Sequence, residues 1–161
     1  MRLEFRAVEA AGPNAFALPG GTIVLTDALV RGFADPHQQA GVLAHEIGHV
    51  LEEHALQRLY RALGLYFVIA LLAGDTGPIL EDLLLEGNVI LSLAHSRAQE
   101  RAADLFGLRL AARAGYDPAA LVGFLGQLEA AGKSGPPTWM STHPPHDARI
   151  EEMLRAIEGS R

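Results

Sequence analysis

The spacing of apolar residues along the chain predicts a small amino-terminal sheet followed by helices. Polar and apolar residues alternate over residues 3–9, which is typical of a strand. Residues 14–18 and Thr22–Thr26 are two further short runs rich in apolar and β-branched residues. The Pro-Gly-Gly sequence between them supplies the backbone freedom of a tight turn, so these two runs are predicted to form a β-hairpin.

The rest of the chain has helical periodicity and recognisable helix ends. Asp27 is predicted to cap a short helix, and Asp35 followed by Pro36 is typical of a helix start, because aspartate caps and proline fits the first helical position. The expected helices are residues 28–32, 36–60, 88–114, 117–131 and Asp147–Glu158. Together with the strands they predict an α+β domain that is mainly helical, with the sheet packed beside the first long helix.

The composition is that of a globular domain. The chain has 161 residues, of which 49% are hydrophobic and 20% charged, so residues 1–161 are predicted to form a single domain. The chain has no cysteine, which excludes a disulfide scaffold, a cysteine-based zinc site and a thiol nucleophile. Its net charge of −6 argues against a general nucleic-acid-binding protein, which would carry a basic patch.

Membrane and targeting signals are weak. The first residues lack the apolar core of a signal peptide, which is compatible with a domain excised from a longer protein. The strongest membrane candidate is residues 62–74, which are fewer than the roughly 20 residues that a helix needs to cross a bilayer. A buried or surface-lying helix is therefore favoured there. For residues 60–92 as a whole, a lid, a core segment and a membrane-facing helix remain open.

One motif in the first long predicted helix carries chemistry. His45-Glu46-Ile47-Gly48-His49 has the form H-E-x-x-H. Residues four apart lie on one face of a helix, so both imidazoles can reach a single metal ion. Glu46 lies beside them, within reach of a water bound to that ion. This arrangement is typical of zinc peptidases, and the alternative is a helix with two surface histidines.

A catalytic zinc needs a third protein ligand. The same helix cannot supply it, because a residue seven positions past His45 lies about 10 Å further along the axis. Glu100 and Asp104, in the second long predicted helix, are four residues apart and share a face. We predict that Glu100 is the third ligand and that Asp104 accepts a hydrogen bond from a zinc-binding histidine. The neighbouring Arg97 and Arg101 leave the alternative of a charged, solvated face.

The sequence spacing does not predict that the remaining histidines bind the metal. On a continuous helix His54 lies about 140° around the axis from His49, so it is predicted to face solvent. His95 is displaced by a similar angle from the acidic face of its own predicted helix. His37 lies near a helix start with no evident partner, and His146 has no assigned role.

Four segments of the chain resemble zinc metallopeptidase family 48, the gluzincin group with HtpX, BepA-like, Oma-type and CAAX prenyl endopeptidase members. Within residues 14–150 and in this order, they are NAFALPGGTIVLTDALV, VLAHEIGHVLEEHAL, SRAQERAADLFGLRLAARAGYDP and STHPPHDARI. The resemblance implies a zincin-like fold with one Zn²⁺ per chain. The zinc ligands that it implies are His45, His49 and Glu100. It also implies that Glu46 is the catalytic glutamate and that Asp104 supports a ligating histidine.

The same resemblance implies roles for the last segment and for the hairpin. His143 matches a histidine that faces the zinc and Arg149 an arginine six residues later, and both would stabilise an oxyanion. Alternatively, His143 would occupy the open zinc position as a latch. The plain alternatives are an exposed loop histidine and a helix-surface arginine. Asn14, Ala15 and Phe16 match the segment expected to bind an extended peptide as an added strand, and the alternative is a hairpin that only covers the core.

These features predict a zinc-dependent endopeptidase that hydrolyses peptide bonds with a zinc-activated water and Glu46 as general base. By the resemblance, its substrates would be misfolded or envelope-associated polypeptides. Its location would be the cell envelope, periplasmic or membrane-associated, with peripheral membrane contact. The alternative function is a zinc-binding chaperone or assembly factor of the envelope with latent proteolysis.

Overall fold

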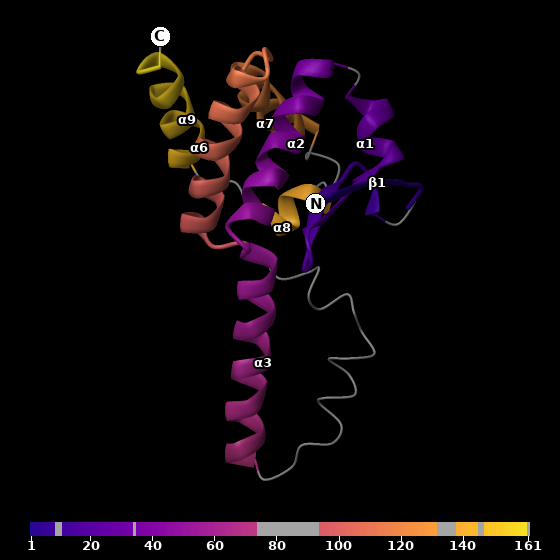
Figure 1. The fold of residues 1–161 in the computed structure, drawn as a ribbon, viewed down its shortest axis with the longest axis vertical. Coiled ribbons are helices and arrows are strands. Elements are labelled where there is room, and N and C mark those ends of the chain that lie inside the picture. The colour runs from indigo at the N-terminus through magenta and orange to yellow at the C-terminus, as the bar shows by residue number, and fades with distance from the viewer. Residues whose placement is uncertain (9–10, 34, 74–93, 132–137, 145–146, 161) are drawn as a thin grey trace.

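A three-stranded sheet lies near the amino terminus of the computed structural model, which describes residues 1–8, 11–33, 35–73, 94–131, 138–144 and 147–160 (Figure 1). The strand order is β1-β3-β2, with β1 at Arg2–Arg6, β2 at Ala15–Leu18 and β3 at Thr22–Thr26. β2 and β3 form the predicted antiparallel hairpin, whereas β1 pairs in parallel with β3. β1 ends before residues 7 and 8 of the predicted strand 3–9, because Arg6 already pairs with the last residue of β3. Residue 9 lies outside the described residues.

The helices confirm the predicted α+β class. They are α1 (Asp27–Gly32), α2 (Pro36–Leu51), α3 (His54–Ala73), α6 (Arg97–Arg113), α7 (Ala119–Ala131), α8 (Thr138–Thr142) and α9 (Asp147–Glu158). Asp35 caps α2 as predicted, its carboxylate accepting a hydrogen bond from the backbone of His37. The cap of α1 is Thr26 rather than Asp27, since the Thr26 hydroxyl accepts from the Leu29 amide.

Two long predicted helices have different bounds in the structure. The segment 36–60 is not one helix: α2 ends at Leu51, and Glu53 has a left-handed φ of 52°, so the chain changes direction before α3 begins. The helix predicted over 88–114 begins only at Arg97, where Ser96 and Gln99 form a capping box. Residues 88–93 lie outside the described residues.

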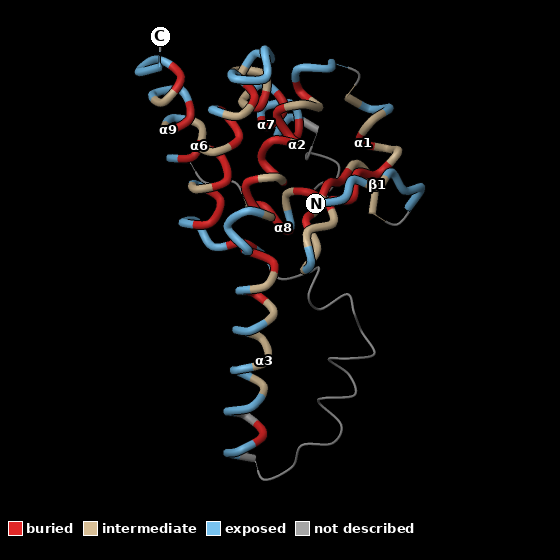
Figure 2. The backbone as a smooth tube through the Cα atoms, in the orientation of Figure 1, coloured by how far each residue is buried: buried red, intermediate tan, exposed pale blue. Residues whose placement is uncertain are grey.

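Close packing between α2 and α6 dominates the helical layer. A Cβ on Gly48 would lie 3.0 Å from the Ala103 Cα, and a Cβ on Gly107 would lie 3.0 Å from the His45 backbone nitrogen. Only glycine at these two positions therefore lets the two backbones approach so closely. Figure 2 shows buried residues along both helices. Both helices contribute to the apolar core, which includes Val42 of α2, Leu108 of α6 and Phe124 of α7.

α3 extends away from the other described helices (Figure 1). Several large apolar side chains on it are exposed: Tyr60, Leu65, Phe67, Val68, Leu71 and Leu72. Residues 62–73 of the predicted apolar stretch thus belong to a longer helix, and residue 74 lies outside the described residues. Within the described residues, His54–Leu72 is one segment whose length and apolar composition would suffice to cross a membrane, a weak signal that some soluble proteins share.

Candidate metal centre

α2 presents His45 and His49 on the face that packs against α6. Both imidazoles are fully buried, and their Nε2 atoms lie 2.9 Å apart. The alternative of two surface histidines is therefore wrong. The i,i+4 spacing on one helix face produces this pair, as the H-E-x-x-H motif predicted.

α6 brings Glu100 and Asp104 against those two rings. Glu100 Oε1 lies 3.3 Å from His49 Nε2, and Asp104 Oδ1 lies 2.9 Å from His45 Nδ1. Both carboxylates are buried, whereas Arg97 and Arg101 on the same helix are exposed. The alternative of a solvated acidic face is therefore wrong.

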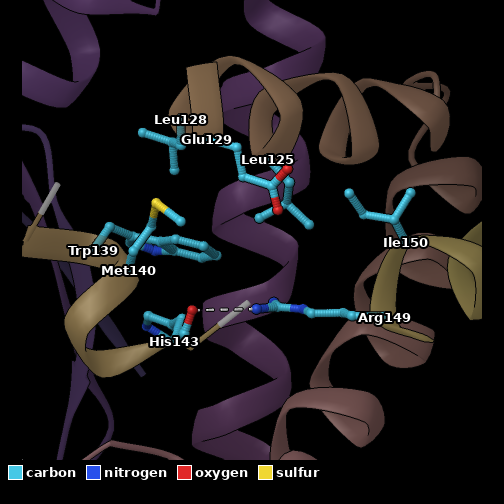
Figure 3. A pocket seen from close by; sticks show the side chains of 8 residues that line it. All are labelled: Leu125, Leu128, Glu129, Trp139, Met140, His143, Arg149 and Ile150. Carbon is cyan, nitrogen blue, oxygen red and sulfur yellow. Dashed lines mark hydrogen bonds between the residues drawn. The ribbon is translucent and has the colours of Figure 1, made fainter. Parts of the chain in front are cut away.

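His143, which follows α8, completes the cluster. Its Nδ1 lies 3.0 Å from Glu100 Oε1 and 3.3 Å from His45 Nε2. Its ring stacks on Trp139 with centroids 4.4 Å apart and planes at 16° (Figure 3). His143 is 1% exposed, so the alternative of an exposed loop histidine is wrong.

Arg149 reaches the centre from α9 and is also buried. Its guanidinium donates two hydrogen bonds to Asp104, at 2.6 and 2.8 Å, and its Nη1 lies 2.8 Å from Glu100 Oε2. A weaker contact joins Nη1 to the carbonyl of His143 at 3.5 Å (Figure 3). The helix-surface alternative for Arg149 is therefore wrong, because its charge is committed to two buried carboxylates.

The surroundings of the two α2 histidines affect how each ring can bind a metal. Asp104 Oδ1 lies 2.9 Å from His45 Nδ1, which leaves the Nε2 lone pair facing the cluster. Burial alone would lower the pKa of His45, but the close, charged carboxylate of Asp104 raises it overall. Burial holds the pKa of His49 well below its usual value, so this ring is neutral, the form that binds a metal.

The donor set fits zinc. One ligand atom from each of four residues lies within 4.8 Å of the other three: His45, His49, Glu100 and His143. Burial opposes ionisation of Glu100, but the surrounding histidines hold its pKa well below the usual value, so it supplies a carboxylate. Imidazole nitrogens with one carboxylate oxygen are ligands that zinc accepts in tetrahedral sites.

Glu46 lies at the edge of this cluster and is buried. Its Oε1 is 3.3 Å from His143 Nε2, and neither carboxylate oxygen has a hydrogen-bond partner within the described part of the chain. Burial raises the pKa of Glu46. A buried carboxylate with free acceptor sites next to a metal centre is suited to bind a water and to take a proton from it.

Two histidines differ from the sequence prediction. His54 was expected to face solvent but is buried, with its Nδ1 2.9 Å from His49 Nδ1, because the break at Glu53 turns the start of α3 inward. His37 does have a partner: its Nδ1 accepts a hydrogen bond from the Asp117 amide.

His95 lies in the segment before α6 and is buried against the centre. Its ring lies against the ring of His49, with centroids 3.8 Å apart and planes tilted by 30°. His146 lies outside the described residues.

The hairpin lies beside the centre with one edge free of strand partners in the described chain. Among the described strands β2 pairs only with β3, and it also contacts α2 and α3. Asn14 and Ala15 are buried, and Phe16 is half-buried. A hollow of about 280 Å³ separates the hairpin turn from the α2–α3 junction and is lined by His49. Both hairpin alternatives stay open, since the strand covers core and also offers an edge.

The sequence reasoning missed Trp139, which stacks on His143, and the buried position of His54. It also gave no role to Gly48 and Gly107. Two glycines on helices that each carry predicted ligands are a usable signal, because glycine within a helix is costly unless something must approach closely.

The comparisons with known proteins agree on one family. Residues 2–157 match peptidase family M48. The chain is 34% identical to the mitochondrial metalloendopeptidase OMA1 of Bos taurus, over 93% of this chain and 31% of that protein. It is 32% identical to the β-barrel assembly-enhancing protease of Escherichia coli strain K12, over 86% of this chain and 31% of that protein. The chain therefore spans roughly a third of the length of these relatives. The family resemblance predicted from the sequence is confirmed.

Proposed function

Because the chain belongs to peptidase family M48, we propose that residues 1–161 form the single catalytic domain of a zinc-dependent endopeptidase. The observation that carries this proposal is the buried group of ligand atoms from His45, His49, Glu100 and His143, with the carboxylate of Glu46 beside it. Structural sites usually close the metal with ligands alone, whereas a carboxylate poised next to the ligands serves hydrolysis.

The residues of the centre have distinct tasks. A zinc ion held there would lower the pKa of a bound water and would polarise the scissile carbonyl. Glu46 would accept a proton at its carboxylate and would deliver it to the leaving amine. Asp104 orients the His45 ring, and Arg149 holds the two carboxylates of α6 in place. Because its guanidinium is already engaged, Arg149 acts on the oxyanion only if substrate binding releases it.

His143 occupies the position of a fourth ligand. Its Nδ1 lies 3.0 Å from Glu100 Oε1 and 3.3 Å from His45 Nε2, so His143 would fill the ligand position that a catalytic zinc site keeps for water. We therefore propose that His143 is a latch, which must swing away before a peptide binds. Its stacking on Trp139 stabilises the closed position.

The substrate is proposed to be a polypeptide in extended conformation. The edge of β2 at Ala15 and Phe16 offers main-chain groups beside the centre, and main-chain pairing does not depend on side-chain identity. A protease that binds its substrate through main-chain hydrogen bonds accepts many sequences, so unfolded or misfolded proteins are suitable substrates. Asn14 would anchor the start of this strand. Its backbone N–H donates to the Thr26 hydroxyl, and its side-chain oxygen is buried without a hydrogen-bond partner in the described chain.

The proposed location is the cell envelope. One relative is named mitochondrial and another is named for β-barrel assembly, and α3 carries the exposed apolar side chains that a membrane contact would need. Fractionation of cells that express the protein tests this, and recovery only in the cytosolic fraction would contradict it.

The decisive experiment compares the purified wild-type chain with two variants, His143→Ala and Glu46→Gln. With zinc bound, wild type and His143→Ala are given unfolded casein, with and without a chelator. We expect chelator-sensitive cleavage that is faster in His143→Ala, and we expect Glu46→Gln to keep zinc and to lose cleavage. Hydrolysis by Glu46→Gln at the wild-type rate would refute the proposed role of Glu46.

The closed position of His143 favours a second candidate, a zinc-dependent chaperone or assembly factor with latent proteolysis. If both wild type and His143→Ala bind zinc but cleave nothing, while Glu46→Gln still suppresses aggregation of an unfolded protein, this second function is supported instead.

A further inference from the structure

The two α2 histidines that face the cluster each have a buried partner on the far side of the ring. For His45 the partner is the carboxylate of Asp104, 2.9 Å from Nδ1. For His49 the partner is a third histidine, His54, whose Nδ1 lies 2.9 Å from His49 Nδ1. Both partners are almost fully buried, at 2% and 5% exposure.

The chain turn before α3 holds His54 in this place. α2 ends at Leu51, and the left-handed Glu53 redirects the chain, so His54 is the first residue of α3 rather than a residue of a continuous helix. The Gln57 side chain donates to the Glu52 carbonyl and accepts from the side chain of Gln99. These bonds tie the start of α3 both to the end of α2 and to α6.

The proton positions follow from the chemistry of a ligating imidazole. A neutral histidine that binds a metal through Nε2 keeps its proton on Nδ1. His49 Nδ1 is therefore the donor of the 2.9 Å bond, and His54 Nδ1 is the acceptor. His54 then carries its own proton on Nε2.

A second metal ion among the same histidines is the competing interpretation, since ligand atoms of His49, His54 and His95 also lie within 4.8 Å of one another. The chemistry of His49 opposes it. A neutral His49 ring that binds zinc through Nε2 keeps its proton on Nδ1, so it has no lone pair left for a second ion. The His95 ring lies over the His49 ring, tilted by 30° with centroids 3.8 Å apart.

We propose that His54 is a positioning residue, which accepts the Nδ1 proton of His49 and so holds that ring with Nε2 toward the zinc. This inference rests on the proposed function, because it requires His49 to bind zinc. His45 and His49 would then be held by acceptors of different charge, a carboxylate and a neutral imidazole.

The test uses the purified chain with zinc, and compares wild type with His54→Leu, His54→Asn and the control His37→Leu. Leucine removes the acceptor, whereas the asparagine oxygen can occupy the place of His54 Nδ1. His37 accepts a backbone hydrogen bond far from the centre along α2, so its replacement controls for loss of a histidine. Zinc affinity is measured by competition with a chelator, and ¹⁵N NMR reports which ring nitrogen of each histidine carries the proton.

We expect His54→Leu to weaken zinc binding about 10- to 100-fold, the range found for partners of metal-binding histidines. We expect His54→Asn and His37→Leu to stay within a few-fold of wild type. In zinc-loaded wild type, NMR is expected to show His49 protonated at Nδ1 and His54 at Nε2. The NMR measurement needs no variant, so it tests the proposal even if His54→Leu does not fold.

Several results would overturn the proposal. These are an unchanged zinc affinity in His54→Leu, an equal loss in His54→Leu and His54→Asn, the opposite proton positions, or a second zinc equivalent that His54→Leu abolishes. A wild-type chain that binds no zinc would overturn the proposed function itself, and with it this inference. Tight zinc binding that does not depend on His54 would overturn the inference alone.

Discussion

The substitution Gly107→Ala tests whether the close approach of α2 and α6 builds the metal centre. The added Cβ would lie 3.0 Å from the backbone nitrogen of His45 and 3.1 Å from its Cα. Carbon atoms pack best at about 3.5–4.0 Å, so the two helices must separate by roughly 0.5–1 Å at this point. The separation moves His45 relative to Glu100 and Asp104, the two residues that reach it from α6.

The magnitude follows from two opposing effects. Overpacking a close contact costs about 1–3 kcal/mol. Alanine is about 1 kcal/mol better than glycine in a helix interior, which offsets part of that cost. We therefore expect the free energy of unfolding to fall by at most ~2 kcal/mol. Zinc affinity is expected to fall about tenfold or more, because binding centres tolerate displacements of only about 0.5 Å.

Gly126→Ala is the matched control, since Gly126 lies in α7 and a Cβ there meets nothing within 4 Å. That variant should be unchanged or slightly more stable, with wild-type zinc affinity. Urea unfolding of the zinc-free protein measures stability, and chelator competition measures zinc affinity. Equal results for Gly107→Ala and Gly126→Ala in both measurements would refute the idea that these backbones must touch.

Three further substitutions test the surroundings of the centre. Asp104→Asn removes the charge that supports His45, so zinc affinity should drop about 10- to 100-fold in chelator competition, and an unchanged affinity would contradict that role. Arg149→Met leaves two buried carboxylates without their cation and should cost about 3–5 kcal/mol in urea unfolding of the zinc-free protein. An unchanged unfolding midpoint would show that these carboxylates are not ionised together. Ser96→Ala removes the cap of α6 and should cost about 1 kcal/mol in the same assay, a cost that would be absent if the capping box were unimportant.

The parts of the centre that come from one helix could be predicted from sequence. The i,i+4 spacing of His45 and His49 depends only on helix geometry, and the same holds for Glu100 and Asp104. The contact between the histidine pair and the carboxylate pair could be expected only from the chemistry of zinc and from the family resemblance. Spacing along a chain says nothing about which helices pack together.

The break between α2 and α3 could not be predicted because its local signal is absent. Glu52 and Glu53 lie at the turn, where glycine or proline would have indicated an end to the helix. Residues other than glycine rarely have a positive φ, so the residue type does not indicate the left-handed conformation of Glu53. The error had a consequence, since it placed His54 on the solvent face.

The sequence by itself determined the α+β composition, the hairpin, the helix start at Asp35 and the chemistry of the ligand types, because each depends on residues within a few positions of one another. The tertiary structure decided which side chains share one centre, the parallel pairing of β1, and the burial of His54, His143 and Arg149. These features depend on contacts between residues far apart in the chain, and such contacts form only when the helices pack.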